Sequence, residues 1–130
     1  MIVTAFYAGL LALLFLVLSA RVIQFRQRGI SLGDGGDPRM LRLIRGHGNF
    51  AEYVPLILVM MVILEAGRTP VWLLHALGIT LLLARMLHGF ALSFTDRFRF
   101  GRFWGAAFTF AALGTSAVLC AWQGLHGMLG

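Results

Sequence analysis

Three polar residues interrupt an apolar part of this 130-residue chain at a spacing that fits one face of a helix. Arg45, Asn49 and Glu52 stand at positions i, i+4 and i+7, which places them along one helical stripe. An ionisable side chain at the centre of a bilayer costs about 2.5–3.5 kcal/mol, and it usually marks a site or an internal ion pair. The stripe therefore predicts either the wall of a polar cavity or a buried ionic network.

A second polar pair, Arg85 and His88, lies further along the chain, and its spacing of three residues also places it on one helical face. An arginine binds carboxylates through paired hydrogen bonds, a glutamate accepts from an ammonium group, and an asparagine amide both donates and accepts. Together the two groups suit a small zwitterion with several carboxylates. Two structural alternatives stay open. Glu52 could join Arg45 or Arg85 in a buried network, and His88 could be a packed histidine without a ligand.

Four apolar segments must position these side chains, and they lie at residues 1–22, 41–66, 71–94 and 103–125. A transmembrane helix needs about 20 mostly apolar residues. The chain is 59% hydrophobic and has a mean hydropathy of +0.85. The first segment lacks the basic leader of a signal peptide, so we expect a retained span. The sequence predicts an all-α, integral membrane four-helix bundle formed by a single domain over residues 1–130.

The charge pattern predicts how the bundle is oriented. All eleven cations are arginines, the formal net charge is +6, and most of the arginines lie in residues 21–45 and 97–102. The short connection after the second span holds Arg68, opposed by Glu65. Basic charge in a soluble chain would suggest nucleic-acid binding, but cations at the ends of apolar spans follow the positive-inside rule. We expect both Arg-rich loops in the cytoplasm, both termini outside, membrane lipids as neighbours and no nucleic acid.

Neither a metal nor a nucleotide is expected at the glycine-rich turn of residues 33–38. The position where an EF-hand loop needs its bidentate Glu is Arg45. The turn also lacks the Gly-Lys-Ser/Thr ending of a phosphate-binding loop. Cys120 is the single cysteine, so a cysteine-based metal site within one chain is excluded. The sequence therefore predicts no metal cofactor.

The segment RGHGNFAEYVP, which begins at Arg45, resembles the MAPEG family, the membrane-associated proteins in eicosanoid and glutathione metabolism. The family pattern is an Arg, an Asn four residues on, a Glu three further and a Pro three beyond, and each element is present. The segment ARMLH is similar to the third-helix motif of the family, with His88 at the place used by the prostaglandin E synthase branch. The resemblance covers the four-span layout of the whole chain and is to a compact, bacterial-type member.

The resemblance implies a homotrimer in the bacterial inner membrane that binds glutathione, its co-substrate, between neighbouring subunits near the cytoplasmic face. A lipophilic second substrate would arrive from the bilayer. The glutathione-binding residues that it implies are Arg45, Asn49, Glu52, Tyr53, Arg85 and His88. Active members have a further catalytic Arg near the start of the fourth span, and both Arg99 and Arg102 could match it. Such a fixed cation lowers the pKa of a thiol below about 8.5 and enriches the nucleophilic thiolate.

One position departs from the family pattern. Catalytic members commonly have a Tyr seven residues after the third-helix Arg, where this chain has Leu92. The first hypothesis is a glutathione transferase or peroxidase that acts on a lipophilic electrophile. The second is a family member that binds lipids or ligands without catalysis. The third is a small proton-coupled multidrug exporter that uses Glu52. Arg45 argues against this hypothesis, because a nearby cation holds a carboxylate ionised and weakens proton exchange.

Overall fold

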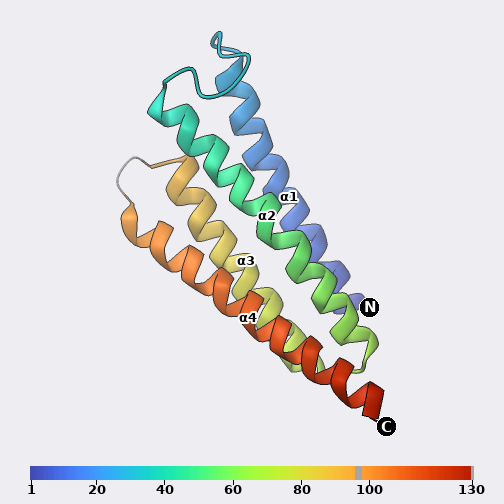
Figure 1. Ribbon diagram of the computed structural model, residues 1–130. Coiled ribbons are helices and arrows are strands. Elements are labelled where there is room, and N and C mark those ends of the chain that lie inside the picture. The colour runs from blue at the N-terminus through green and yellow to red at the C-terminus, as the bar shows by residue number, and fades with distance from the viewer. Residues whose placement is uncertain (96–97, 130) are drawn as a thin grey trace.

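The computed structural model describes residues 1–95 and 98–129, which form four helices (Figure 1). They are α1 (Ile2–Arg26), α2 (Pro38–Ala66), α3 (Val71–Ser93) and α4 (Arg99–Leu129). Each of the four is long and apolar enough to cross a bilayer. The predicted all-α membrane bundle is therefore confirmed. Arg97, which the sequence places among the loop arginines, lies outside the described residues.

Consecutive helices run antiparallel, and α2 and α3 form the centre of the bundle (Figure 1). α1 packs against α2 and α3 on one side, and α4 packs against both on the other. The interior is filled by fully buried apolar side chains such as Leu11, Ile57, Met61 and Leu81. Large apolar side chains also cover the outside, including Leu16, Val59 and Leu83, each more than half exposed. An apolar interior under an apolar exterior is what a lipid environment requires.

α1, α2 and α4 extend beyond the predicted spans, because the polar residues next to each apolar segment also adopt a helical conformation. α2 begins three residues before the predicted position, where Asp37 accepts a hydrogen bond from the amide N of Arg39 at 2.7 Å and Pro38 occupies the first turn. α4 already begins at Arg99, so both candidate catalytic arginines lie in its first turn. Pro70 occupies the N-cap position of α3, and no side-chain hydrogen bond caps the start of this helix.

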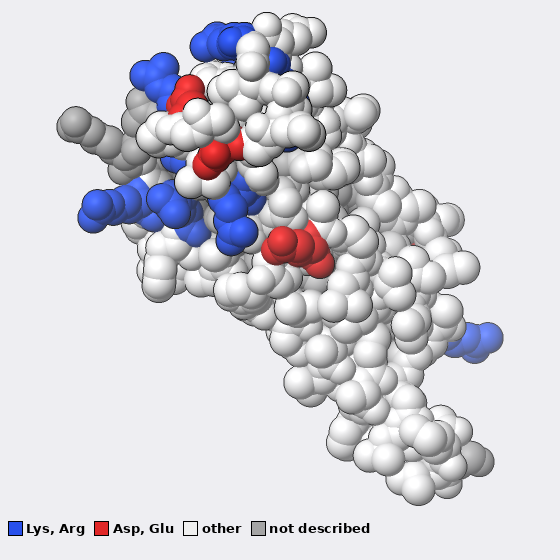
Figure 2. Space-filling model, turned by 45° about the horizontal axis from the view of Figure 1, so that its top comes forward, with Lys and Arg blue, Asp and Glu red and all other residues white. Residues whose placement is uncertain are grey.

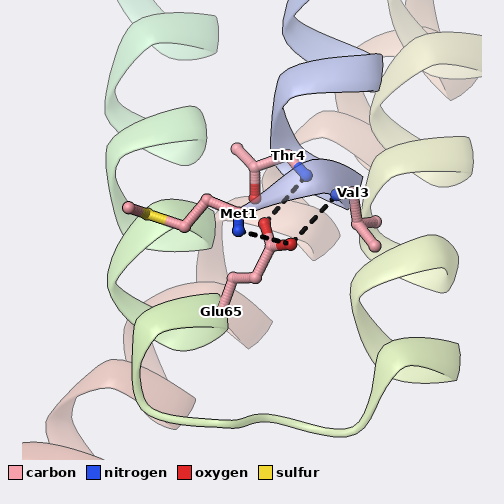
Figure 3. Close-up of polar contacts among 4 residues, drawn as sticks. All are labelled: Met1, Val3, Thr4 and Glu65. Carbon is pink, nitrogen blue, oxygen red and sulfur yellow. Dashed lines mark hydrogen bonds and ion pairs between the residues drawn. The ribbon is translucent and has the colours of Figure 1, made fainter.

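Glu65 at the end of α2 holds the start of α1 (Figure 3). Its carboxylate oxygens accept hydrogen bonds from the amide N of Val3 and of Thr4, each at 2.9 Å. The amine of Met1 lies 3.6 Å from the same carboxylate. The first amides of a helix have no partner within the helix, and a negative charge there is favourable. The sequence placed Glu65 opposite Arg68, whereas in the structure it serves as a cap for a different helix.

We expect Glu65→Ala to destabilise the protein because two amides at the start of α1 lose their acceptor. The loss of a charged acceptor for buried donors costs about 1–3 kcal/mol. The free energy of unfolding, measured by titrating the protein in mixed micelles with sodium dodecyl sulfate, should fall by that amount. Glu65→Gln keeps one acceptor and should cost less. Equal stability of Glu65→Ala and the unchanged protein would show that the cap contributes nothing.

Candidate functional site

The polar stripe of α2 divides into an outward and an inward part. Arg45 and Glu52 are exposed, whereas Asn49 and Tyr53 are half-buried toward α3 and α4. Within the part of the chain that the structure describes, neither Arg45 nor Glu52 has an ion-pair or hydrogen-bond partner. The described residues of one chain therefore do not form the ionic network between Glu52 and Arg45 or Arg85 that the sequence left open. Both charges stay available on its surface.

Arg85 is the charged residue that joins the three helices of the site. Its side chain is only 2% exposed. One Nη donates to the carbonyl O of Asn49 in α2 at 3.4 Å, and the other Nη donates to the carbonyl O of Gly105 in α4 at 3.3 Å. Its Nε is buried and has no hydrogen-bond partner in residues 1–95 and 98–129. Among the described residues no carboxylate pairs with Arg85. A buried cation of this kind attracts an anion, since no described residue neutralises its charge.

A small cavity of about 70 Å³ opens beside Arg85 between α2, α3 and α4. Four of the predicted glutathione-binding residues meet there, together with three residues of α4; the lining consists of Asn49, Tyr53, Arg85, His88, Ala106, Thr109 and Phe110. The ring of Tyr53 packs edge-on against that of Phe110, with the ring centres 5.2 Å apart. Ligand pockets typically measure about 300–1,000 Å³. One chain therefore provides a wall of a ligand site and does not enclose it.

A second cavity, of about 420 Å³, lies next to the first one, and it contains both candidate catalytic arginines. It is lined by His88, Arg99, Arg102, Phe103 and Ala106. His88 and Ala106 line both cavities, so the two spaces adjoin. Arg99 and Arg102 project from the first turn of α4, where the helix dipole adds to their positive charge. An anion in this cavity would be stabilised by two guanidinium groups and a helix start.

The close approach of α3 and α4 depends on Gly105. A Cβ atom at this position would lie 2.7 Å from Cβ of His88, 2.8 Å from its backbone N and 2.9 Å from the carbonyl O of Ala84. Thr109 donates from its hydroxyl to the carbonyl O of Gly105 at 2.7 Å, and that same carbonyl also accepts from Arg85. Small residues allow helix backbones to approach in lipid. Gly105 thus sets the position of His88 and Arg85 relative to α4.

Two features of the site were not foreseen as parts of it. Thr109 and Phe110 line the smaller cavity, but in the sequence they look like ordinary members of an apolar span. The available signal was the spacing of four residues from Gly105 to Thr109 and from Ala106 to Phe110, which places the two members of each pair on one side of α4. Leu92, the residue in the place of the family Tyr, is 5% exposed and would contact a Cβ at Gly46 at 3.2 Å. It packs against α2 and offers no hydroxyl to the site.

The remaining histidines lie apart from these cavities. Nε2 of His47 is 3.1 Å from the hydroxyl of Ser19, and its ring stacks on Phe15 with the centres 4.6 Å apart. Nδ1 of His75 is 2.9 Å from the hydroxyl of Tyr7. Among residues 1–95 and 98–129, no group of three or more His, Cys, Asp or Glu side chains is close enough to hold a metal ion. The polar side chains that line the two cavities are arginines, an amide, a phenol, a hydroxyl and an imidazole.

Comparison with known proteins gives two findings. The family model described as "MAPEG family" matches residues 4–122. Inner membrane protein YecN of Escherichia coli strain K12 is 40% identical over 87 residues, and YecN of strain O6:H1 gives the same values. Each alignment covers 66% of this chain and 66% of the relative. The chain thus spans just under two thirds of the length of these relatives.

Proposed function

Because the chain belongs to the MAPEG family, we propose that it binds glutathione as a co-substrate and transfers it to a lipophilic electrophile in the bacterial inner membrane. The observation that carries the proposal is the meeting of Asn49, Tyr53, Arg85 and His88 around one cavity. The inner membrane is the location that the printed name of YecN gives for that relative. Four membrane-spanning helices agree with it.

The tripeptide glutathione carries two carboxylates, one ammonium group and one thiol, and the site offers a partner to each. Arg85 and Arg45 would bind the carboxylates through paired hydrogen bonds. Glu52 would bind the ammonium group, while Asn49 would bind a peptide group of the ligand. The thiol would then lie toward Arg99 and Arg102, which line the adjoining cavity. Tyr53 and His88 line the smaller cavity beside these groups and would contact the bound tripeptide.

A homotrimer would complete this site. Arg45 and Glu52 are exposed and have no partner among the described residues, while the cavity beside Arg85 is too small to enclose a tripeptide. A neighbouring copy placed against α2 would cover both parts. The arginines of α4, from either the neighbouring copy or the first chain, would then line the end of the site that holds the thiol. Covering two charged side chains in this way is favourable only when they gain partners such as the charged groups of a ligand.

The chemistry would proceed in two steps. The glutathione thiol loses its proton to solvent because a guanidinium group of Arg99 or Arg102 stabilises the thiolate. The thiolate sulfur then forms a bond to an electrophilic carbon, and the leaving group departs with the electron pair. With an organic hydroperoxide, two glutathione molecules are instead oxidised to the disulfide, while the hydroperoxide is reduced to an alcohol and water. Both reactions use the same stabilised thiolate.

The orientation that we propose places the arginine-rich end of the bundle in the cytoplasm. Figure 2 shows basic side chains concentrated at one end of the molecule, and Figure 1 places the α1–α2 and α3–α4 connections at the same end. The positive-inside rule assigns such an end to the cytoplasm. Glutathione would then reach the site from the cytoplasm, and the chain termini would face outward.

A second candidate function is binding of a lipophilic ligand without turnover. Leu92 favours it, because this residue packs against Gly46 where catalytic relatives commonly have a Tyr. In that case glutathione or a lipid would occupy the cavities without forming a thioether. Conjugation of 1-chloro-2,4-dinitrobenzene, followed by its absorbance, distinguishes the two. Glutathione binding without conjugation of this or other electrophiles would favour the second function.

Glu52→Gln tests the glutathione site separately from the fold. Glu52 is exposed and has no partner among the described residues, so stability should be unchanged. The dissociation constant of glutathione, measured by calorimetry in detergent, should rise about tenfold because a charged hydrogen bond contributes about 1.5–3 kcal/mol. Asp34→Asn, which removes a carboxylate from the α1–α2 loop, is the matched control and should leave affinity unchanged.

Other outcomes of this experiment would select other functions. Lower stability with unchanged glutathione affinity would assign Glu52 a structural role. Loss of proton-coupled efflux from vesicles, without any effect on glutathione, would instead identify a multidrug exporter.

A further inference from the structure

A third cavity lies outside the candidate site, between α1, α2 and α3. Its volume is about 260 Å³, and it is lined by Arg21, Phe25, Arg28, Arg39, Arg42, Leu43, Leu92, Ser93, Phe94 and Thr95. It shares none of its lining residues with the two cavities of the candidate site. Four arginines from two helices and the loop between them therefore surround a space that the proposed glutathione chemistry does not use.

The charged side chains in the described lining of this cavity are all basic. Arg21, Arg28 and Arg39 lie there together with Arg42, and no described acidic side chain lines the cavity. The nearby loop carboxylates have local partners: Asp37 accepts from the amide N of Arg39 at 2.7 Å, and Asp34 accepts from the amide N of Gly36 at 3.1 Å. The first turn of α2 also contributes the positive end of a helix dipole. Mutual repulsion of the arginines would be relieved by a bound anion.

Arg21 is held with its guanidinium group in place. One Nη donates to the carbonyl O of Ser93 at 3.0 Å, and the guanidinium carbon lies 4.7 Å from the centre of the Phe94 ring. Its Nε is buried and has no hydrogen-bond partner in the part of the chain that the structure describes. A guanidinium that is already oriented by a carbonyl and an aromatic ring loses little freedom when it binds a ligand.

We propose that this cavity binds the phosphate group of an anionic phospholipid. Arginine is the side chain best suited to phosphate oxygens, because its donors form paired, charge-assisted hydrogen bonds. A water molecule occupies about 30 Å³ in the liquid, so the cavity has room for several waters or one phosphate group. Phosphate is the shared chemistry of a lipid headgroup and of free inorganic phosphate. The surroundings favour the lipid.

Those surroundings are apolar on the outside of the bundle. Phe94 lines the cavity and is 50% exposed, and Ile23 on α1 is 56% exposed. Acyl chains can lie along these exposed apolar faces while the phosphate enters the arginine-lined space. The cavity also lies at the end of the bundle where the basic side chains gather, which is where the headgroups of one leaflet would be (Figure 2).

The test compares lipids of different charge on the full chain in neutral detergent. Dioleoylphosphatidylglycerol should remain bound in native mass spectrometry and raise the melting temperature more than dioleoylphosphatidylcholine does. Arg28→Gln and Arg39→Gln each remove an exposed arginine of the cavity, and each should weaken phosphatidylglycerol binding about fivefold. Arg26→Gln is the matched control. It removes one charge from the same end of α1, from a residue outside the cavity lining, and should leave the affinity within about twofold.

Three results would overturn the proposal. If Arg26→Gln weakened binding as much as Arg28→Gln, the attraction would be that of a general basic surface. If both lipids bound alike, the site would not recognise an anion. If inorganic phosphate bound as tightly as phosphatidylglycerol, the ligand would be a free anion. Arg28→Lys keeps the charge and should retain most of the affinity, which guards against a variant that fails to fold. Glutathione binding is measured on the same variants, and it should not change.

Discussion

Arg102→Ala should lower the rate of glutathione conjugation, expressed as kcat/KM, about 100-fold. Arg102 and His88 both line the larger cavity. Removal of one group that stabilises a developing anion costs about 100- to 1,000-fold in other enzymes. The effect should arise in the reactivity of the bound thiol, since Arg102 is exposed and is not needed for packing.

Arg99→Ala is the comparison that assigns the role to one residue. Both arginines line the same cavity, and they stand three residues apart in the first turn of α4. We expect Arg99→Ala to lower kcat/KM about tenfold, because it removes part of the positive field and leaves Arg102 in place. Unfolding and glutathione binding should be unchanged in both variants. The reverse order of effects would make Arg99 the catalytic residue, and no effect of either variant would remove α4 from the chemistry.

Gly105→Ala should lower both stability and activity, because it changes how α3 and α4 pack. A Cβ atom at Gly105 would lie within 2.9 Å of backbone atoms of α3, which cannot give way as a flexible side chain can. The two helices would have to separate, and overpacking of this kind costs about 1–3 kcal/mol. Arg85 and His88 would shift relative to α4. A misplacement of about 1 Å can lower turnover about 100-fold. Unfolding and kcat/KM should therefore both change.

Gly114→Ala provides the matched control on the same helix. No atom lies within 4 Å of the position that its Cβ would occupy. Alanine also has the higher helix propensity, so this variant should be as stable as the unchanged protein or more stable. If Gly105→Ala were equally harmless, the contact between α3 and α4 would be looser than described, and the carbonyl of Gly105 would not position Arg85.

The sequence was sufficient to predict the four membrane helices because lipid imposes a length and an apolar composition on each span. The residues at which the helices begin and end were harder to predict from the sequence. The cap by Asp37 extends α2 to Pro38, and the turn at Arg99 extends α4, because polar residues continue a helix once it leaves the apolar layer. Glu65 was assigned to Arg68 by its proximity in sequence, yet it caps α1, which lies more than 60 residues away. Tertiary contacts of this kind leave no local signal.

The site was predictable to the extent that helical periodicity and the family motif describe it. The spacing of Asn49, Arg85 and His88 indicated residues of shared faces, and the structure brings them to one cavity. The division of the α2 stripe could not be predicted from periodicity, since it depends on where α4 packs and which side of α2 it leaves uncovered. Gly105 stood out only as one small residue among many. The structure shows that a Cβ atom at this position would collide with His88, so the close approach of α3 and α4 requires glycine.

The most direct test of the central claim is an ultraviolet difference spectrum of the purified protein in detergent, titrated with glutathione at neutral pH. A thiolate absorbs near the edge of the protein spectrum, whereas a thiol does not. We predict a saturable thiolate signal that is lost in Arg102→Ala while calorimetric binding is retained, because the cation lowers the pKa of the bound thiol. Binding without a thiolate signal in the unchanged protein would contradict catalysis, and absence of binding would contradict the glutathione site itself.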